Sequence, residues 1–498
     1  MIVLGDLIGR GLTRQGAVDP FEGAIGDERR SVTSAESMAM LRVLTARLDG
    51  ASRVGVFSNH RVETYLAAVA SAMSRATFAP LNPSFPAARL RRVVELADLD
   101  VIVCDSSTVA QCEELFAGVS VVNVTDVVAS VVPDDSDAAW MEVQLTDEVD
   151  EGAIAYLMFT SGSTGDPKGV PVSYGSLAAY LRGITELVGI PKGLRHSQFF
   201  DLSFDLSMHD IFVSRVLDGT LVAPKPVDLM MPGAFVARER IDAWFSVPVL
   251  GALLGRSKKR DGYDGLRHML FCGEALPMET VAACRAHLAP GGRMWNLYGP
   301  TEATIAFTAA EVTALDRSSG TAPIGLPFGD NTCALLDGEI IDTNPPEGAE
   351  GELLLGGPQV FAGYSTEAPS PFVDGEGARF YRSGDLVRME RAGIEFRGRV
   401  DSQIKWRGYR IELAEIETAI RAEFGLNTVA VVLSKTTSGP TISAWCVSAE
   451  CGDVPDLERL RGTLPEYMIP STIVVLDEMP LNANGKIDRG ALAKRDLP

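Results

Sequence analysis

Short apolar runs alternate with longer amphipathic stretches over the first half of the chain. The runs at 53–59 (RVGVFSN), 101–105 (VIVCD) and 120–124 (SVVNV) are rich in β-branched residues, and the Ala-rich stretch from Glu63 to Ala76 has the length of a helix. Strands that alternate with helices are typical of βαβ units. The pattern therefore predicts an α/β fold with a parallel sheet in this half.

The pattern changes twice further along the chain. From Gly325 to Gly398 short strands such as GELLLGG and AGIEFRGR are separated by Gly and Pro turns, which predicts a β-rich module. After Asp401 we expect a strand, a helix over 414–424, the strands TVAVVLS and ISAWCVS, and then a helix and a strand. The predicted domains are residues 1–400 and 401–498. The acidic stretch from Pro133 to Glu151 is interpreted as a solvated surface connection.

Composition and charge exclude several classes of protein. A chain of 498 residues corresponds to about three ordinary domains or two large ones. Its net charge of −21 repels nucleic acids and anionic lipids, so we expect neither as a partner. No signal peptide and no apolar stretch of membrane-spanning length is visible, which predicts a cytoplasmic protein without membrane contact. The seven cysteines show no C-x-x-C spacing and are expected to be reduced, buried thiols.

A loop rich in Gly and hydroxyl residues follows an apolar strand that is predicted to end at Thr160. Residues 153–174 read AIAYLMFTSGSTGDPKGVPVSY, and the loop supplies backbone N–H groups, hydroxyls and one ammonium, which suit a polyphosphate. The spacing does not match a Walker A loop. A surface turn is the alternative for this segment taken alone. The predicted phosphate ligands are Thr160, Ser161, Gly162, Ser163, Thr164, Gly165 and Lys168.

Further motifs follow in order along nearly the whole chain. They are 81–90 (LNPSFPAARL), 200–212 (FDLSFDLSMHDIF), 271–277 (FCGEALP), 296–305 (NLYGPTEATI), 381–386 (YRSGDL), 398–413 (GRVDSQIKWRGYRIEL) and 479–492 (MPLNANGKIDRGAL). Together with the loop they resemble the adenylate-forming superfamily, which comprises acyl-CoA synthetases, luciferases and the amino acid adenylation domains of nonribosomal peptide synthetases. The resemblance implies a large N-terminal domain of layered sheets and helices with a β-rich subdomain, and a small, mobile α+β C-terminal domain.

The resemblance also implies the positions that hold ATP and Mg²⁺. Glu302, beside Thr301, is expected to contact Mg²⁺, because hard cations prefer carboxylate oxygens; a buried ion pair is the alternative. Asp385 is expected to accept hydrogen bonds from the ribose hydroxyls, with Arg399 near the ribose and phosphates. Lys486 is expected to be the catalytic lysine, acting with Lys168. The resemblance assigns the remaining nucleotide contacts to Gly273, Glu274, Ala275, Asn296, Tyr298 and Gly299.

The implied chemistry brings one anion up to another. A substrate carboxylate attacks the α-phosphorus of ATP, so the enzyme supplies cations and fixed dipoles instead of a nucleophile. The products are an acyl-adenylate and pyrophosphate, and a thiol then attacks the adenylate. In this superfamily the C-terminal domain rotates between the two steps, which implies a hinge at Asp401 and a thiol tunnel lined by Lys405 and Gly408. A turn-forming Asp is the alternative for Asp401.

Asp205 favours an amino acid as the substrate. It aligns with the aspartate that amino acid adenylation domains use to hold the α-ammonium group, and a buried carboxylate needs such a cation. A helix N-cap is the alternative. Whether Leu250 belongs to the pocket wall is left open, because the spacing to this position is one residue shorter than in the family. The mostly apolar wall predicts a small or aliphatic side chain such as that of alanine, although His209 does not fit a purely apolar pocket. The other positions implied for the wall are Leu206, Leu270, Cys272, Leu297, Ile305 and Ala306.

The thiol is expected to come from another molecule. The sequence ends twelve residues after Lys486 and shows no Gly-Gly-x-Ser attachment motif, so a separate carrier protein with a phosphopantetheine arm is the predicted partner. Because such carriers are usually acidic, the densest basic run is a candidate docking site, with a solvated loop as the alternative. Its members are Arg256, Lys258, Lys259, Arg260 and Arg267.

Three other functions are compatible with parts of the pattern. An acyl-CoA or amide ligase that acts on a non-amino carboxylate would share most motifs but would not need Asp205. A non-catalytic adenylate-binding regulatory protein would be expected to have lost chemical residues, yet Lys168, Glu302, Asp385 and Lys486 all match. A luciferase-like activity has the same motifs, and Asp205 again argues against it.

Overall fold

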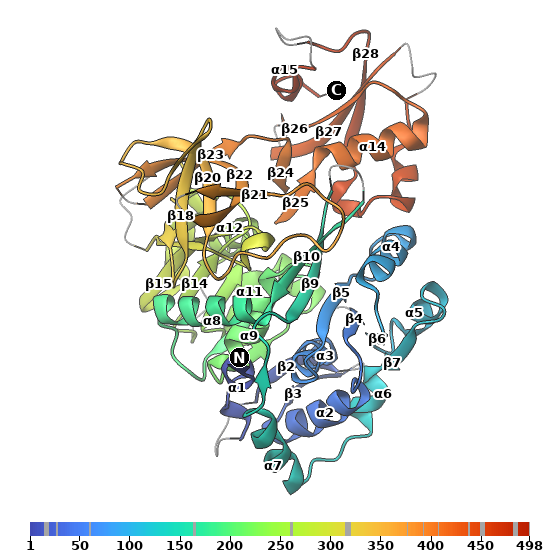
Figure 1. Cartoon of the computed structure of the whole chain (residues 1–498), viewed down its shortest axis with the longest axis vertical. Coiled ribbons are helices and arrows are strands. Elements are labelled where there is room, and N and C mark those ends of the chain that lie inside the picture. Colours follow the sequence, from blue (N-terminus) through green and yellow to red (C-terminus); the bar gives the residue numbers. More distant parts are fainter. Residues whose placement is uncertain are drawn as a thin grey trace. The chain divides into compact units, whose positions relative to one another are not determined.

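The computed structural model describes most of the chain (Figure 1). The described residues are 1–13, 19–25, 28–58, 61–162, 166–258, 262–313, 320–375, 377–391, 393–406, 408–436, 439–448, 454–481 and 487–497. They divide into two compact units. The first comprises Met1–Pro83, Leu96–Met158 and Gly169–Val400, and the second Ser84–Glu95, Phe159–Lys168 and Asp401–Pro498. The second unit thus takes in two segments of the predicted N-terminal domain, and the predicted division into 1–400 and 401–498 stays a prediction.

One sheet is formed largely by the βαβ region. Its order in the described residues is β10-β9-β5-β4-β6-β7, and β4 lies parallel to both β5 and β6. This confirms the predicted parallel sheet. The strands are β4 (Arg53–Phe57), β5 (Thr77–Leu81), β6 (Val101–Cys104), β7 (Ser120–Asn123), β9 (Ile154–Thr160) and β10 (Lys168–Ser173).

The Ala-rich helix α3 (Val62–Met73) lies between this sheet and the next. All of its residues are buried, and it contacts β4 and β5 on one side and β2 of the second sheet on the other. Small side chains let a helix approach two sheets at once. The composition of this stretch is therefore explained by its place in the core.

The second sheet positions most of the site. Its order in the described residues is β17-β16-β15-β14-β13-β11-β12-β2-β3, and the strands from β2 to β15 in this order are parallel, so their carboxyl ends lie at one edge. Strands β16, β17 and β3 pair antiparallel. The strands are β2 (Phe21–Ile25), β3 (Glu28–Val32), β11 (Arg195–Ser197), β12 (Thr220–Val222), β13 (Ala243–Ser246), β14 (Leu266–Phe271), β15 (Leu288–Tyr298), β16 (Thr308–Glu311) and β17 (Leu326–Pro327).

The segment from Gly325 to Gly398 forms the predicted β-rich module. Its strands pair antiparallel, and a separate apolar cluster that includes Leu353, Leu355 and Tyr381 packs beneath them. The strands are β18 (Thr332–Asp337), β19 (Ile340–Asp342), β20 (Glu350–Gly356), β21 (Phe372–Gly375), β22 (Ala378–Glu390) and β23 (Gly393–Arg399).

The part of the second unit after residue 400 has its own core. A hairpin of β24 (Gln403–Trp406) and β25 (Tyr409–Glu412) leads into helix α14 (Leu413–Phe424), whose Ile416 and Ile420 are buried in it. A three-stranded sheet follows, made of β26 (Val429–Thr436), β27 (Gly439–Val447) and β28 (Thr472–Leu476). The helix predicted between the last two strands is present as two short 3₁₀ helices, at Leu457–Gly462 and Glu466–Met468. Pro465 lies between the two and cannot continue a helix.

The acidic stretch after Pro133 is more ordered than predicted. Asp134 caps helix α7 (Asp135–Gln144) in a capping box with Asp137, and β8 (Glu148–Val149) pairs with β1 (Ile2–Val3). Most of the stretch is exposed or half-buried, which agrees with a solvated surface connection, but it also contains a helix and a strand that the sequence did not predict. Its acidic residues supply caps at the helix N-terminus, where negative charge is favourable.

Two expectations from composition can be compared with the structure. No described helix is long and apolar enough to cross a bilayer. None of the six described cysteines forms a disulfide; five are buried and Cys333 is half-buried, while Cys451 lies outside the described residues.

Candidate functional site

The edge formed by the carboxyl ends of β14 and β15 gathers several predicted nucleotide contacts. Phe271 and Asn296 are paired in register at this edge, so the residues that follow each strand lie close together. Gly273, Glu274 and Ala275 follow β14, and Gly273 has a positive φ of 92° that favours glycine.

The Asn296 side chain has one amide atom without a partner. Its Nδ2 donates to the Pro323 carbonyl oxygen at 2.8 Å, whereas its buried Oδ1 accepts no hydrogen bond from any described residue. A buried acceptor left alone is unfavourable unless a ligand fills it. An amino group such as that of adenine would supply the missing donor, so this residue fits ATP.

Asp385 is a buried carboxylate whose two oxygens are both paired. It lies in β22 directly opposite Arg399 of β23, whose Nη1 donates to Oδ1 at 2.5 Å, and the Tyr298 hydroxyl donates to Oδ2 at 2.5 Å. The sequence analysis assigned all three residues to the nucleotide. The structure brings them together into one charged cluster, and burial raises the pKa of Tyr298 well above its usual value.

The segment after β15 turns sharply back on itself. Gly299 packs so closely that a Cβ there would lie 2.7 Å from the Ala306 Cα, and the Phe307 N–H donates to the Tyr298 carbonyl oxygen at 2.7 Å. Thr304 and Ile305 have positive φ values of 58° and 68°, which are strained for β-branched residues. Strain of this kind persists only where surrounding contacts fix the backbone.

Gln359 provides those contacts, and the sequence analysis missed it. The side chain is buried, and its Nε2 donates to the carbonyl oxygens of Ala303, Thr304 and Ala306 at 3.2, 3.2 and 2.7 Å. The Thr304 hydroxyl donates back to the Gln359 carbonyl oxygen at 2.7 Å. Gln359 lies in a loop of the β-rich module more than fifty residues away, so no local pattern pointed to it.

Asp205 is a buried carboxylate with a different environment. Its Oδ2 accepts a hydrogen bond from the Ile305 N–H at 3.1 Å, and the Thr301 hydroxyl also pairs with it. No cation pairs with it in the part of the chain that the structure describes. Burial, followed by the charge of Glu302, raises its pKa from 3.8 to about 6. Asp205 stands at the N-cap position of α9 (Leu206–Val216) but makes no side-chain capping bond, so the N-cap alternative is wrong.

Glu302 is buried at the start of the same turn. Its Oε1 accepts a hydrogen bond from the Tyr364 hydroxyl at 2.8 Å. Among the described residues, no group of three or more His, Cys, Asp or Glu side chains could hold a metal ion. Mg²⁺ commonly binds through one or two carboxylates together with phosphate oxygens, and a single Glu fits that habit.

The predicted substrate-wall residues are all buried, and most share one apolar cluster. His209 is also buried and packs its ring on Phe245 with 4.3 Å between centroids. Leu250, the position left open, belongs to a second cluster with Phe271. The wall residues in the first cluster are Leu206, Leu270, Cys272, Leu297, Ile305 and Ala306.

The phosphate loop belongs to the second unit. The Ser161 hydroxyl donates to the Arg410 carbonyl oxygen at 3.0 Å and accepts from the Glu412 N–H at 3.2 Å. A Cβ at Gly162 would lie 2.1 Å from the Asp166 carbonyl oxygen, so the loop needs glycine there. Thr160 ends β9, as predicted, and Lys168 begins β10. Ser163, Thr164 and Gly165 lie outside the described residues.

The predicted hinge and tunnel residues flank the hairpin of β24 and β25. The Asp401 Oδ1 accepts from the Gln403 N–H at 3.1 Å, as in a simple Asx turn, which fits the turn alternative as well as a hinge. Lys405 lies in β24, and Gly408 has a φ of 87° at the hairpin turn. Lys486 lies outside the described residues, so its role stays a prediction.

The described members of the basic run lie at the other edge of the second sheet. Three of them are exposed, namely Arg256, Lys258 and Arg267. Arg256 is the last residue of α12 (Pro248–Arg256). Because β14 is parallel to β13, the chain has returned to the amino edge by the start of β14, where Arg267 lies. This edge is opposite to Asn296, so the placement gives the docking prediction no support. Lys259 and Arg260 lie outside the described residues.

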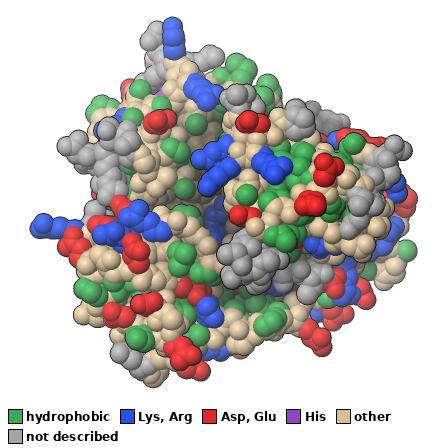
Figure 2. Space-filling view, turned by 90° about the horizontal axis from the view of Figure 1, so that it is seen from above, with side chains coloured by type: hydrophobic (Ala, Val, Ile, Leu, Met, Phe, Trp, Pro, Cys, Tyr) green, Lys and Arg blue, Asp and Glu red, His purple; other side chains and the backbone are tan. Residues whose placement is uncertain are grey.

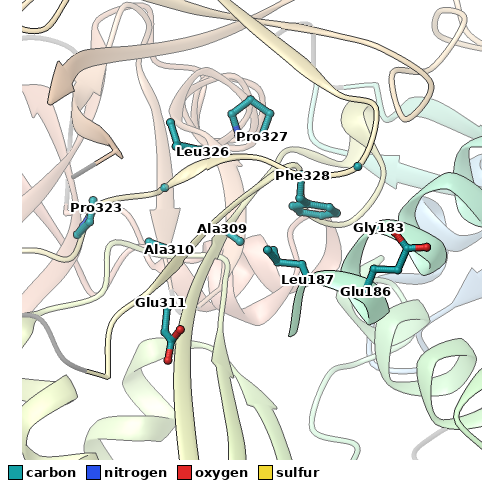
Figure 3. Close-up of a pocket in the computed structure, with 12 residues that line it drawn as sticks. Gly183, Glu186, Leu187, Ala309, Ala310, Glu311, Pro323, Leu326, Pro327 and Phe328 are labelled. Carbon is teal, nitrogen blue, oxygen red and sulfur yellow. The ribbon is translucent and has the colours of Figure 1, made fainter. Parts of the chain in front are cut away.

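Surface charge and cavities add little to this site. Figure 2 shows a face on which acidic, basic and apolar side chains are interspersed. A pocket of about 650 Å³ is lined by Leu187 of α8 (Tyr174–Val188) and by Leu326 and Phe328 around β17 (Figure 3). It includes none of the predicted site residues.

Comparisons with known proteins agree with this geometry. A family model described as AMP-binding enzyme matches residues 16–365. The L-proline–[L-prolyl-carrier protein] ligase of Streptomyces coelicolor is 32% identical over 488 residues, covering 92% of this chain and 91% of the relative. Phosphinothricin tripeptide synthetase PhsC of Streptomyces viridochromogenes is 32% identical over 456 residues; the match covers 88% of this chain but 40% of that synthetase, so the chain spans less than half of its length. The crystal structure of the Vibrio cholerae adenylation domain AlmE in complex with glycyl-adenosine-5'-phosphate superposes with a TM-score of 0.83 at 27% identity, covering 95% of this chain and 94% of that one.

Proposed function

Because the chain belongs to the AMP-binding enzyme family, we propose that it is a ligase that adenylates an amino acid with ATP and transfers the aminoacyl group to the phosphopantetheine thiol of a separate carrier protein. The relative named for carrier-protein ligation and the glycyl-adenylate bound to AlmE support this assignment. We further propose a small side chain, since the wall is largely apolar and bulky. A cytoplasmic location stays a prediction.

The observation that carries the proposal is the state of Asp205. A buried carboxylate that lacks a cation among the described residues is unfavourable, and burial raises its pKa to about 6. The α-ammonium group of an amino acid would supply the missing charge. A fatty or aryl acid would leave Asp205 unpaired, so the geometry favours an amino acid over the acyl-CoA ligase alternative.

The residues of the first unit would orient the two reactants. Asn296 Oδ1 would accept the adenine amino group, and Asp385 would accept the ribose hydroxyls while Arg399 and Tyr298 hold its carboxylate in place. Asp205 would fix the amino end of the substrate. Holding two reactants in line is worth up to about 7 to 11 kcal/mol of the barrier in favourable cases.

Positive charge would stabilise the transition state. When bound, Mg²⁺ would supply charge to the phosphate oxygens, and Glu302 is the residue we propose to hold it. Lys168 and Lys486 would offset the negative charges that meet as the carboxylate attacks the α-phosphorus. The attack forms the bond between the carboxylate oxygen and phosphorus and releases pyrophosphate.

The second step would need only a thiol. AMP is a good leaving group, so a phosphopantetheine thiolate can displace it from the aminoacyl-adenylate without an acyl-enzyme. We propose that Lys405 and Gly408 line the approach of the thiol and that Asp401 absorbs the change between the two steps.

The test is amino-acid-dependent exchange of labelled pyrophosphate into ATP, run over all common α-amino acids and over β-amino acids. We expect exchange with one or a few amino acids and a large loss in Lys486→Ala. A second assay with phosphopantetheinylated carrier proteins would detect the thioester. Exchange with no amino acid, or exchange that Lys486→Ala leaves intact, would refute the proposal.

A further inference from the structure

Three polar aromatic side chains lie in or against the apolar cluster that holds the substrate wall: two tyrosines are members of it, and a histidine packs on two of its aromatic rings. They are Tyr156 of β9, Tyr180 of α8 and His209 of α9, and they are 1%, 0% and 2% exposed. The sequence analysis singled out only His209. Buried hydroxyl and imidazole groups are costly unless they are paired, so each needs an explanation.

Tyr180 and His209 pair with each other. The Tyr180 hydroxyl lies 2.6 Å from His209 Nδ1, and the two rings meet edge to face with 6.0 Å between centroids. Burial lowers the pKa of His209 to about 3, so the imidazole is neutral at physiological pH. This bond uses one ring nitrogen. The other, Nε2, makes no hydrogen bond to any residue that the structure describes.

Tyr156 has no such partner. Its hydroxyl is buried and unpaired within the described ranges. Tyr156 shares its apolar cluster with Leu206 and Ile305, and the Ile305 N–H binds the Asp205 carboxylate that we assign to the substrate ammonium group. Burial, and after it the charge of Asp205, raises the pKa of Tyr156. The apolar cluster therefore contains an O–H donor close to the position that we propose for the amino group of the substrate.

We propose that Tyr156 and His209 hydrogen-bond the side chain of the amino acid, and that this side chain is short and ends in a neutral hydroxyl or carboxamide group. The inference rests on the proposed amino acid activation and revises its alanine-like side chain. A hydroxyl or carboxamide both donates and accepts, so it can pair with the Tyr156 O–H and with His209 Nε2 in either tautomer.

A charged side chain fits this surrounding less well. A second carboxylate would lie near Asp205 without a cation, and like charges in a buried site repel each other. A second ammonium group would need another ionised acid. Asp210, the next residue on α9, is buried, and burial raises its pKa well above the usual value, which disfavours its ionised form.

Isosteric amino acid pairs test the proposal through pyrophosphate exchange. Threonine against valine and asparagine against leucine differ mainly in polarity. We expect the wild type to prefer the polar member of at least one pair by tenfold or more in kcat/KM, because a site built to hydrogen-bond a group rejects analogues that lack it. Tyr156→Phe should lower kcat/KM for the polar member about tenfold and leave the aliphatic member unchanged.

The matched control is Tyr174→Phe. Tyr174 is also fully buried, but its hydroxyl donates to the Ala76 carbonyl oxygen at 3.1 Å, so its loss should not change the ratio within a pair. His209→Leu is a second test and should shift the ratio in the same direction as Tyr156→Phe.

The outcomes separate this inference from the proposed function. If amino acids support exchange but the aliphatic member of both pairs is preferred, or a charged amino acid is best, the inference is overturned and amino acid activation stands. The same holds if Tyr156→Phe and Tyr174→Phe change the ratio equally. If no amino acid supports exchange, both fall.

Discussion

Two buried aspartates at the site, Asp385 and Asp205, differ in the groups that surround them, and this difference suits them to different roles. Asp385 is 2% exposed and has Arg399 and Tyr298 on its two oxygens. Asp205 is 6% exposed and accepts hydrogen bonds from uncharged donors, among them the Ile305 N–H and the Thr301 hydroxyl. Asp385 carries its counter-charge permanently. Asp205 has no counter-charge among the described residues. A carboxylate whose cation arrives with the substrate would be expected to look like this in the free protein.

The largest expected effect comes from removing the unpaired carboxylate. Asp205→Ala should lower kcat/KM for the amino acid by about 10²- to 10⁴-fold, because losing one side of a buried ion pair costs about 3 to 5 kcal/mol. The KM for ATP should change little. Pyrophosphate exchange measures both values, and Asp330→Ala, at an exposed aspartate, is the control. Unchanged amino acid kinetics would show that Asp205 does not hold the ammonium group.

The same carboxylate should weaken the free protein at neutral pH. Its pKa is raised from 3.8 to about 6, so the folded state binds the extra proton and stability is lost as pH rises between these values. Asp205→Asn should remove this loss and raise the free energy of unfolding at pH 7 by up to about 3 kcal/mol. Denaturant unfolding of the wild type and the variant at pH 4 and pH 7 measures this change in the free energy of unfolding. An equal effect at both pH values would contradict the raised pKa.

A related pH effect should appear in the kinetics. If the amino acid binds ionised Asp205, as we propose, kcat/KM for the amino acid should be level above about pH 6 and fall about tenfold per pH unit below it. Saturation with the amino acid should move this inflection to lower pH, since an ammonium partner favours the charged carboxylate. A profile that is flat down to pH 5 would contradict this.

Removing the permanent cation should make the two aspartates more alike. Arg399→Leu leaves Asp385 with Tyr298 alone, and we expect the KM for ATP to rise about 10- to 100-fold, because hydrogen bonds to charged groups are worth about 1.5 to 3 kcal/mol. The KM for the amino acid should stay within twofold. Arg388→Leu, at a more exposed arginine of the same module, is the control. Equal loss for both substrates would indicate general disruption.

A smaller effect is expected where a third residue supports Asp205 indirectly. Gln359→Leu removes the amide that fixes the strained turn, and the KM for the amino acid should rise several-fold as Ile305 loses its position. The free energy of unfolding should fall by about 1 to 2 kcal/mol, since the carbonyl oxygens lose their donor. Gln111→Leu, whose amide makes one long bond of 3.4 Å at the surface, is the control. A fall in stability without any change in KM would contradict a positioning role.

The smallest effect is expected at the surface cations. We consider the replacement of Arg256, Lys258 and Lys259 by Glu. These substitutions should not alter the surroundings of either aspartate, so pyrophosphate exchange should be unchanged. Transfer to an acidic carrier should slow only if the carrier docks there. Initial rates of thioester formation measure this, and unchanged transfer would refute docking at this edge.

The sequence was most informative where chemistry follows a strand. The apolar run before Thr160 predicted a strand that ends there, because small and polar residues follow it, and β9 ends at that residue. The β-rich module was predicted from its Gly and Pro turns in the same way. These features are local, and local patterning is what a single sequence records best.

Contacts between distant segments could not be predicted. The pairing of Asp385 with Arg399 depends on the register of β22 and β23, and the support from Gln359 depends on a loop that folds back over fifty residues. The helix after Asp134 was missed for a different reason. Its acidic residues suggested a solvated segment, although three of them begin the helix and two form its capping box.

The strand that carries Arg399 also fixes the point where the chain leaves the first unit. Arg399 is held by Asp385, and the next N–H, that of Val400, donates to the Gly384 carbonyl oxygen at 2.9 Å. Residues 399 and 400 are therefore held in place by the first unit, directly before the position where we propose that the backbone turns. If Asp385 binds the ribose and the backbone turns at Asp401, as we propose, the contact with the ribose would not depend on that turn, and the adenosine group would stay bound through both reactions.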